Sequence, residues 1–110
     1  MSWRANIVGG RIADKYKEPV KAYQLAAGAS SASITLNDGS WDERLARLTA
    51  VGADIRWNLN AAASSTTHFL KENQSIEIKV PWTSDTTTIH AIRNASTSGT
   101  LEITSFREYT

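Results

Sequence analysis

The sequence predicts an all-β protein, an antiparallel β-sandwich or jelly roll of about seven to eight strands. Two observations carry this prediction. Short segments alternate apolar and polar residues, which is the period of a strand with one buried face. Turn residues separate these segments at the spacing of about 8–12 residues that is typical of sandwiches. The 110 residues suffice for one hydrophobic core and are too few for a second, so we expect one domain.

The clearest strand pattern lies between Gln74 and Phe106. Residues 74–80 alternate in polarity until Pro81, residues 85–92 are rich in β-branched side chains, and residues 100–106 alternate again. Turn residues separate the three segments. Consecutive strands of this kind are typical of an antiparallel meander, so we expect them to pair in sequence order.

Shorter strand patterns precede this stretch. We expect strands at residues 20–25, 33–36, 54–59 and 67–70. In the third of these segments, Trp57 has the same parity as Ile55 and Leu59. Because side chains alternate between the two faces of a strand, Trp57 is expected in the core.

Residues 41–51 leave two alternatives open. Ser40 and Glu43 fit the capping box of a helix, and Gly52 stands where such a helix would end. Residues 44–51 also fit a strand that enters a hairpin around Gly52. The strand is favoured because the segments on both sides have strand patterns, and one short helix remains the alternative.

The N-terminal residues 1–18 have no regular apolar period, and we expect them to form an extended arm before a single sandwich domain of residues 19–110. The arm carries two aromatic residues, Trp3 and Tyr16, which could anchor it on its own domain or on a neighbour. Both alternatives stay open, because the segment has no pattern that decides between them.

The composition bounds the partners and the compartment of the protein. A formal net charge of +1 argues against a nucleic-acid partner and against an anionic membrane, since basic surfaces recognise both. The chain has no cysteine, so its stability depends on packing or on assembly rather than on disulfides. It has no signal-peptide core and no run of transmembrane length, so we expect synthesis in a bacterial cytoplasm.

The residues that could carry catalysis or bind a metal form no known pattern. The chain has no Gly-x-Ser-x-Gly elbow to accompany its two histidines, His68 and His90. Without cysteine, two histidines far apart in sequence do not make a zinc ligand set. We therefore expect no catalytic residue, no metal and no cofactor. Glu77 and Glu102 are each expected to pair with cations across neighbouring strands.

Three tryptophans stand at positions that favour exposure: Trp3 in the arm, Trp41 after a turn, and Trp82 after Pro81. Exposed aromatic residues fit either a protein interface or a platform for stacking sugars. The interface is favoured because it needs no groove of polar sugar-binding groups. The candidate contact residues for a protein partner are Trp3, Arg4, Arg11, Tyr16, Trp41 and Trp82.

Several of these features together resemble a known family. The cysteine-free length near 110, the loops rich in Ala, Ser and Thr, and the run SIEIKVPWTSDTTTIHAIRNASTSGTLEITSF of residues 75–106 are similar to those of the capsid decoration (cement or staple) proteins of tailed bacteriophages. The resemblance implies a jelly-roll-like sandwich on the outside of an icosahedral capsid. There a dimer or trimer would fasten neighbouring subunits of the phage major capsid protein, and no catalytic residues come with this role.

The expected function is therefore that of a non-enzymatic structural protein of a virion, located on the capsid exterior. Two alternatives remain. One is a carbohydrate-binding β-sandwich module, which would need an exposed, coplanar aromatic platform. The other is a component of the phage tail or connector, which would share both fold and composition.

Overall fold

The computed structural model describes residues 16–38, 42–80 and 86–109 of the chain. These residues form eight β-strands in two four-stranded antiparallel sheets, with no helix in the described ranges. The strands are β1 (Tyr16–Ala27), β2 (Ala32–Leu36), β3 (Leu45–Val51), β4 (Ile55–Leu59), β5 (His68–Leu70), β6 (Ser75–Lys79), β7 (Thr87–Arg93) and β8 (Gly99–Tyr109). The all-β sandwich predicted from the alternation is confirmed.

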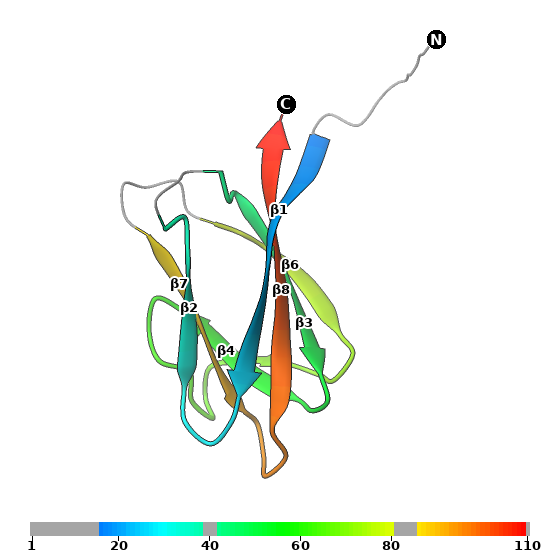
Figure 1. Ribbon diagram of the computed structural model, residues 1–110. Coiled ribbons are helices and arrows are strands. Elements are labelled where there is room, and N and C mark those ends of the chain that lie inside the picture. The colour runs from blue at the N-terminus through cyan, green and yellow to red at the C-terminus, as the bar shows by residue number, and fades with distance from the viewer. Residues whose placement is uncertain (1–15, 39–41, 81–85, 110) are drawn as a thin grey trace.

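Both sheets arise from one antiparallel ribbon that is rolled up. β1 pairs with β8, β2 with β7, β3 with β6 and β4 with β5, so the second half of the chain retraces the first. Pairing of β3 with β8 and of β4 with β7 then completes two sheets, with the orders β1-β8-β3-β6 and β2-β7-β4-β5. This is the eight-stranded jelly roll, whose strands are shown in Figure 1.

The core lies between the two sheets and follows from the alternation. In β7, Ile89 and Ala91 are fully buried on the inner face, while His90 and Ile92 lie on the outer face. Trp57 in β4 is 6% exposed, which confirms its predicted core position. The other buried apolar residues of this cluster are Leu25, Ala27, Leu36, Ala46, Leu48, Ala50, Ile55, Leu70, Val80, Leu101 and Ile103.

The predicted meander of the last three strands is wrong, although all three strands exist. β6 pairs with β3, β7 lies in the other sheet between β2 and β4, and β8 returns to the first sheet between β1 and β3. Alternating polarity shows that a segment buries one face, and it carries no information about which strand lies beside it. In a jelly roll, most consecutive strands belong to opposite sheets.

The ambiguous segment forms β3, so the strand alternative is confirmed and the helix alternative is wrong. The expected hairpin around Gly52 is also wrong, because β3 and β4 lie in different sheets. Gly52 has a φ of 87°, a left-handed conformation that glycine adopts without strain, and it forms the corner between the two layers. Glu43, expected to cap a helix, instead directs its side chain into the interior, where it is 1% exposed.

β1 is longer than the predicted strand. It begins at Tyr16 and so includes the last three residues of the segment expected to be an arm, while residues 1–15 lie outside the described residues. Its register against β8 shifts between Pro19 and Lys21, because proline cannot donate a ladder hydrogen bond. Tyr16 pairs with Tyr109, so the start of β1 and the end of β8 lie together (Figure 1).

Two inter-strand connections reach the same end of the sandwich as these paired strand ends. Leu36, the last residue of β2, pairs with Thr87, the first residue of β7. The Val80 amide donates to the Arg44 carbonyl at 2.9 Å, and the Arg44 amide donates to the carbonyl of Phe106 in β8 at 2.8 Å. We call this the terminal end of the molecule.

Candidate functional site

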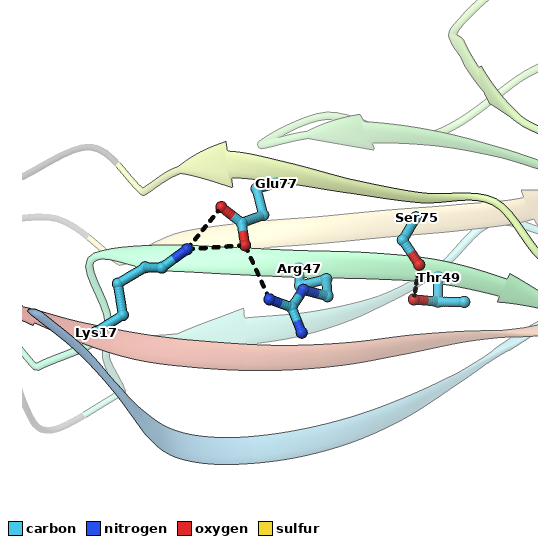
Figure 2. Close-up of polar contacts among 5 residues, drawn as sticks. All are labelled: Lys17, Arg47, Thr49, Ser75 and Glu77. Carbon is cyan, nitrogen blue, oxygen red and sulfur yellow. Dashed lines mark hydrogen bonds and ion pairs between the residues drawn. The ribbon is translucent and has the colours of Figure 1, made fainter. Parts of the chain in front are cut away.

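The outer face of the sheet β1-β8-β3-β6 carries a network of charged side chains from three strands (Figure 2). Glu77 in β6 accepts hydrogen bonds from the Lys17 ammonium at 3.1 and 3.2 Å. It also accepts one from the Arg47 guanidinium of β3 at 3.0 Å. Arg47 and Glu77 face each other in the β3–β6 register, so the sheet itself brings these two together. We call these three residues the ionic ladder.

The ionic ladder covers an aromatic residue. The guanidinium carbon of Arg47 lies 5.1 Å from the centre of the Phe106 ring, and the Lys17 nitrogen lies 5.9 Å from it. Phe106 belongs to the outer face of β8, yet it is only 7% exposed. Both cations are within the distance at which the ring face attracts positive charge. The ladder therefore shields an apolar side chain while presenting a charged surface to solvent.

The carboxylate of Glu77 has a pKa below its ordinary value. The hydrogen bond from Arg47 is the largest cause, and the hydrogen bond from Lys17 follows. Donors that bond the charged form of a carboxylate favour that form over the protonated one. The predicted cross-strand pairing of Glu77 is thus confirmed.

Polar pairs extend this face toward the far end of the sheet. The hydroxyls of Thr49 and Ser75 share a hydrogen bond of 2.6 Å across β3 and β6 (Figure 2). The amide of Gln24 in β1 donates to Glu102 in β8 at 3.2 Å, so Glu102 also pairs across neighbouring strands, with an amide rather than a cation. Because β3 separates β6 from β8, Glu77 and Glu102 do not lie on neighbouring strands.

A second polar cluster is buried at the edge of the core, and sequence reasoning missed it. One carboxylate oxygen of Glu43 accepts hydrogen bonds from the Tyr23 hydroxyl at 2.6 Å and the Ser105 hydroxyl at 2.5 Å. The other accepts one from the Asn37 backbone amide at 2.6 Å. The Asn37 side chain in turn bonds the Glu43 backbone amide and carbonyl, at 2.8 and 2.9 Å. The cluster fixes the connection from β2 to β3.

Tyr23 has its pKa raised above the ordinary value. Burial is the largest cause, and the hydrogen bond to Glu43 is the next. Both disfavour the phenolate. Burial removes the water that would solvate its charge, and the hydrogen bond to Glu43 stabilises the protonated hydroxyl that donates it. Tyr23 therefore acts as a hydrogen-bond donor that holds Glu43.

Among the described residues, the outer face of the other sheet carries one exposed apolar aromatic side chain. Phe69 in β5 is 45% exposed, and the Arg56 guanidinium carbon lies 4.9 Å from its ring centre. Arg56 is held by hydrogen bonds to the Asn94 side chain at 2.8 Å and to the Thr67 carbonyl at 3.0 Å. The cation is thus fixed against one face of the ring.

The two histidines lie on opposite faces of this sheet. His68 pairs with Trp57 and stacks on it with ring centres 4.5 Å apart, whereas His90 pairs with Asn58 on the outer face and bonds the Thr88 hydroxyl at 3.0 Å. Among the described residues, no group of three or more histidine, aspartate or glutamate side chains could hold a metal ion.

A shallow depression of about 230 Å³ lies at the end opposite the terminal end. Its polar groups bond one another: the Asp54 carboxylate accepts from the Glu72 amide at 2.8 Å, and the Asp54 carbonyl accepts from the Asn94 amide at 3.2 Å. These groups hold neighbouring loops together. The lining residues are Gly52, Ala53, Asp54, Glu72, Asn94, Ala95 and Thr97.

The predicted contact residues fall outside the part of the chain whose side chains are described. Trp3, Arg4 and Arg11 precede β1, and Trp41 and Trp82 lie in the gaps 39–41 and 81–85. For Tyr16 only the backbone is described. The topology nevertheless places Tyr16 and the described residues on either side of both gaps at the terminal end.

The fold and the surfaces define a jelly-roll domain with an ion-paired outer face. Its buried carboxylate, Glu43, is hydrogen-bonded to three other parts of the chain. No protein-family model, no curated protein and no solved structure matches the chain. Within the described ranges, no helix is long and apolar enough to cross a membrane.

Proposed function

We propose that this chain is a non-enzymatic virion protein that binds the outer surface of a phage capsid and bridges neighbouring major capsid protein subunits. The resemblance of residues 75–106 to capsid decoration proteins supports the proposal. The fold supports it by analogy, because the jelly roll is a frequent architecture of viral capsid domains. A clamp of this kind gains avidity when one molecule contacts several subunits.

One observation carries the proposal. The described residues that adjoin segments 1–15, 39–41 and 81–85 lie at the terminal end, although they are far apart in the sequence. These segments contain five of the six candidate contact residues, and Tyr16, the sixth, is the first residue of β1. The candidate residues in and beside these segments are aromatic residues and arginines, the residue types that are enriched in protein interfaces. The ionic ladder lies on the sheet that contains β1 and β8, whose paired ends Tyr16 and Tyr109 are at the terminal end. It supplies a preorganised charged surface beside this end.

Co-sedimentation with expanded, DNA-free shells of the source phage tests the proposal. We expect binding that saturates at a fixed ratio to the major capsid protein. Removing residues 2–15 keeps all of β1 and should abolish binding while the domain stays folded. Val51→Ala is the matched control, because Val51 is an exposed apolar residue at the opposite end and its truncation should leave binding unchanged.

Two outcomes would contradict this proposal. Shells that never retain the protein would favour a tail or connector component instead. A variant without residues 2–15 that still decorates shells fully would refute the role of the N-terminal segment.

A carbohydrate-binding module is the second candidate, favoured by the exposed Phe69 ring and its fixed Arg56 partner. One face of an aromatic ring beside fixed polar groups can stack on a sugar. In a glycan-retention assay, Phe69→Ala, Trp41→Ala or Trp82→Ala should abolish retention without unfolding the protein. Retention by all three variants at the level of the unchanged protein would exclude the aromatic platform.

A further inference from the structure

β6 has an unpaired edge in the described part of the structure. The Ala50 amide donates to the Gln74 carbonyl at 3.2 Å, and the Val80 amide donates to Arg44 at 2.9 Å. Backbone groups of an antiparallel strand point alternately to its two neighbours, so the even-numbered residues of β6 bond β3. The amides and carbonyls of the odd-numbered residues point to the side where the sheet order ends. These residues are Ser75, Glu77 and Lys79.

The same edge leaves the core incompletely covered. Ile76 and Ile78 face the core but are only partly buried, whereas their register partners Leu48 and Ala46 on β3 are fully buried. The opposite sheet gives little cover on this side, because its own edge strand β5 has three residues. An added strand with apolar residues at alternate positions would complete the layer.

The chain contains a segment with this pattern. In residues 2–8, the apolar side chains of Trp3, Ala5 and Ile7 alternate with Ser2, Arg4 and Asn6, and Gly9-Gly10 follows. The spacing of two residues matches that of Ile76 and Ile78. Seven residues are also enough to pair along the five residues of β6.

The position of β1 favours pairing of residues 2–8 with the β6 edge of another molecule rather than with their own β6. Residues 2–8 precede β1, which forms the opposite edge of the same sheet from β6. To reach its own β6, the segment would have to cross β8 and β3 at the terminal end and then run parallel to β6. Parallel pairing is slightly less stable per residue, and a second copy permits the antiparallel arrangement. Each copy has one such segment and one such edge, so the exchange can be reciprocal.

We propose that residues 2–8 of one copy add as an antiparallel strand to the free edge of β6 in a second copy, where Trp3, Ala5 and Ile7 cover Ile76 and Ile78. The backbone bonds come from Ser75, Glu77 and Lys79. This self-association goes beyond the proposed capsid binding and is tested on the purified protein without shells, so either proposal can fail alone.

Sedimentation of the full chain across a concentration series measures self-association and so tests whether it occurs through the free edge of β6. The full chain should associate, and Lys79→Pro should weaken association at least tenfold, because it removes an amide that points to the free edge. The fold should survive, since that amide is no part of the β3–β6 ladder. Lys79→Ala is the matched control, which loses the same side chain but keeps the amide and should associate normally. In the segment, Ile7→Ser should weaken association, and Arg4→Ser should not.

A mixing experiment distinguishes exchange between copies from pairing within one molecule. A variant lacking residues 2–8 keeps the edge, and Lys79→Pro keeps the segment, so each should be monomeric alone and the two should form a complex when mixed. The proposal is overturned if the full chain is monomeric at all concentrations. It is also overturned if the variant lacking residues 2–8 associates like the full chain, or if the mixture forms no complex.

Discussion

Among the single residues that the structure describes, Glu43 is a charged side chain that is only 1% exposed and is held by several hydrogen bonds. Its carboxylate accepts from Tyr23, Ser105 and the Asn37 amide, and its side chain is buried. Asn37 has a φ of 59°, in the left-handed region that asparagine tolerates better than most residues. The geometry of the β2–β3 connection thus depends on a pair, Asn37 and Glu43, that bond each other through side chains and backbone.

Glu43→Leu should be strongly destabilising, because leucine has a comparable size but no acceptor. It leaves the Asn37 amide and two hydroxyls without their partner, and each unsatisfied buried donor costs about 1–3 kcal/mol. We expect a loss of about 3 kcal/mol or more in the free energy of unfolding, measured by urea denaturation. The neighbouring Asp42→Asn alters only an exposed ion pair with Arg107 and should cost less than about 1 kcal/mol. Equal losses in both variants would contradict the role of Glu43.

Tyr23 should make the protein sensitive to alkali. Its pKa is raised in the folded state by burial and by the bond to Glu43, so the folded protein keeps the phenol neutral while the unfolded chain ionises near the ordinary value of 10.0. The stabilisation is therefore fully present below about pH 10 and is lost as the pH rises above it. Urea denaturation at about pH 9 and about pH 11 should show this loss, and Tyr23→Phe should reduce it. An unchanged pH slope in Tyr23→Phe would assign the effect to other groups.

Between strands, the ionic ladder predicts an order of pKa effects. Because the Arg47 bond is the largest cause of the lowered Glu77 pKa, Arg47→Ala should raise that pKa more than Lys17→Ala does. The stabilisation from Glu77 is present above the ordinary carboxyl pKa and is lost as the pH falls through the lowered folded value. Side-chain carboxyl NMR titration measures both pKa values. The reverse order would show that Lys17 is the dominant partner.

The close approach of two connections at Gly99 predicts a steric effect. A Cβ added there would lie 2.8 Å from the Val51 carbonyl oxygen and 3.1 Å from the Ala53 amide, both of them backbone atoms. Gly99→Ala should therefore destabilise by about 1–3 kcal/mol, the usual cost of overpacking. Gly28→Ala is the control, since the nearest atom would be 4.0 Å away. Thermal unfolding of the two variants compares them directly, and equal melting temperatures would refute the clash.

The sequence predicts strands well and their partners poorly, for a physical reason. Strand alternation is a local property, so Trp57 could be assigned to the core without knowing any neighbour. Pairing depends on residues distant in sequence: Glu43 meets Tyr23 and Ser105, which are 20 and 62 positions away. Its capping-box pattern fitted a helix that the rest of the fold overrides. The described residues that adjoin segments 1–15, 39–41 and 81–85 come together at the terminal end because of the topology, and no local sequence pattern indicates this.

At the scale of the whole molecule, the rolled ribbon places the longest ladder between the two ends of the sequence. β1 and β8 pair along nearly their full lengths, whereas the tip of the ribbon, β4 with β5, is short. The chain must therefore close its largest loop to form its most extensive pairing. Loop closure of this kind slows folding more than it affects stability.

A circular permutant tests this consequence. A short glycine-serine linker would join Tyr109 to Tyr16, which already pair, and new ends would be opened between Ala61 and Ala62, which are both exposed. The β1–β8 ladder then becomes a local hairpin, the short β4–β5 pairing becomes long-range, and the β3–β6 and β4–β7 pairings span a greater sequence separation than before. We expect the permutant to fold to similar stability and to refold faster than the linear chain of residues 16–110, followed by stopped-flow tryptophan fluorescence. A folded permutant that refolds no faster would show that closure of the β1–β8 ladder does not limit folding.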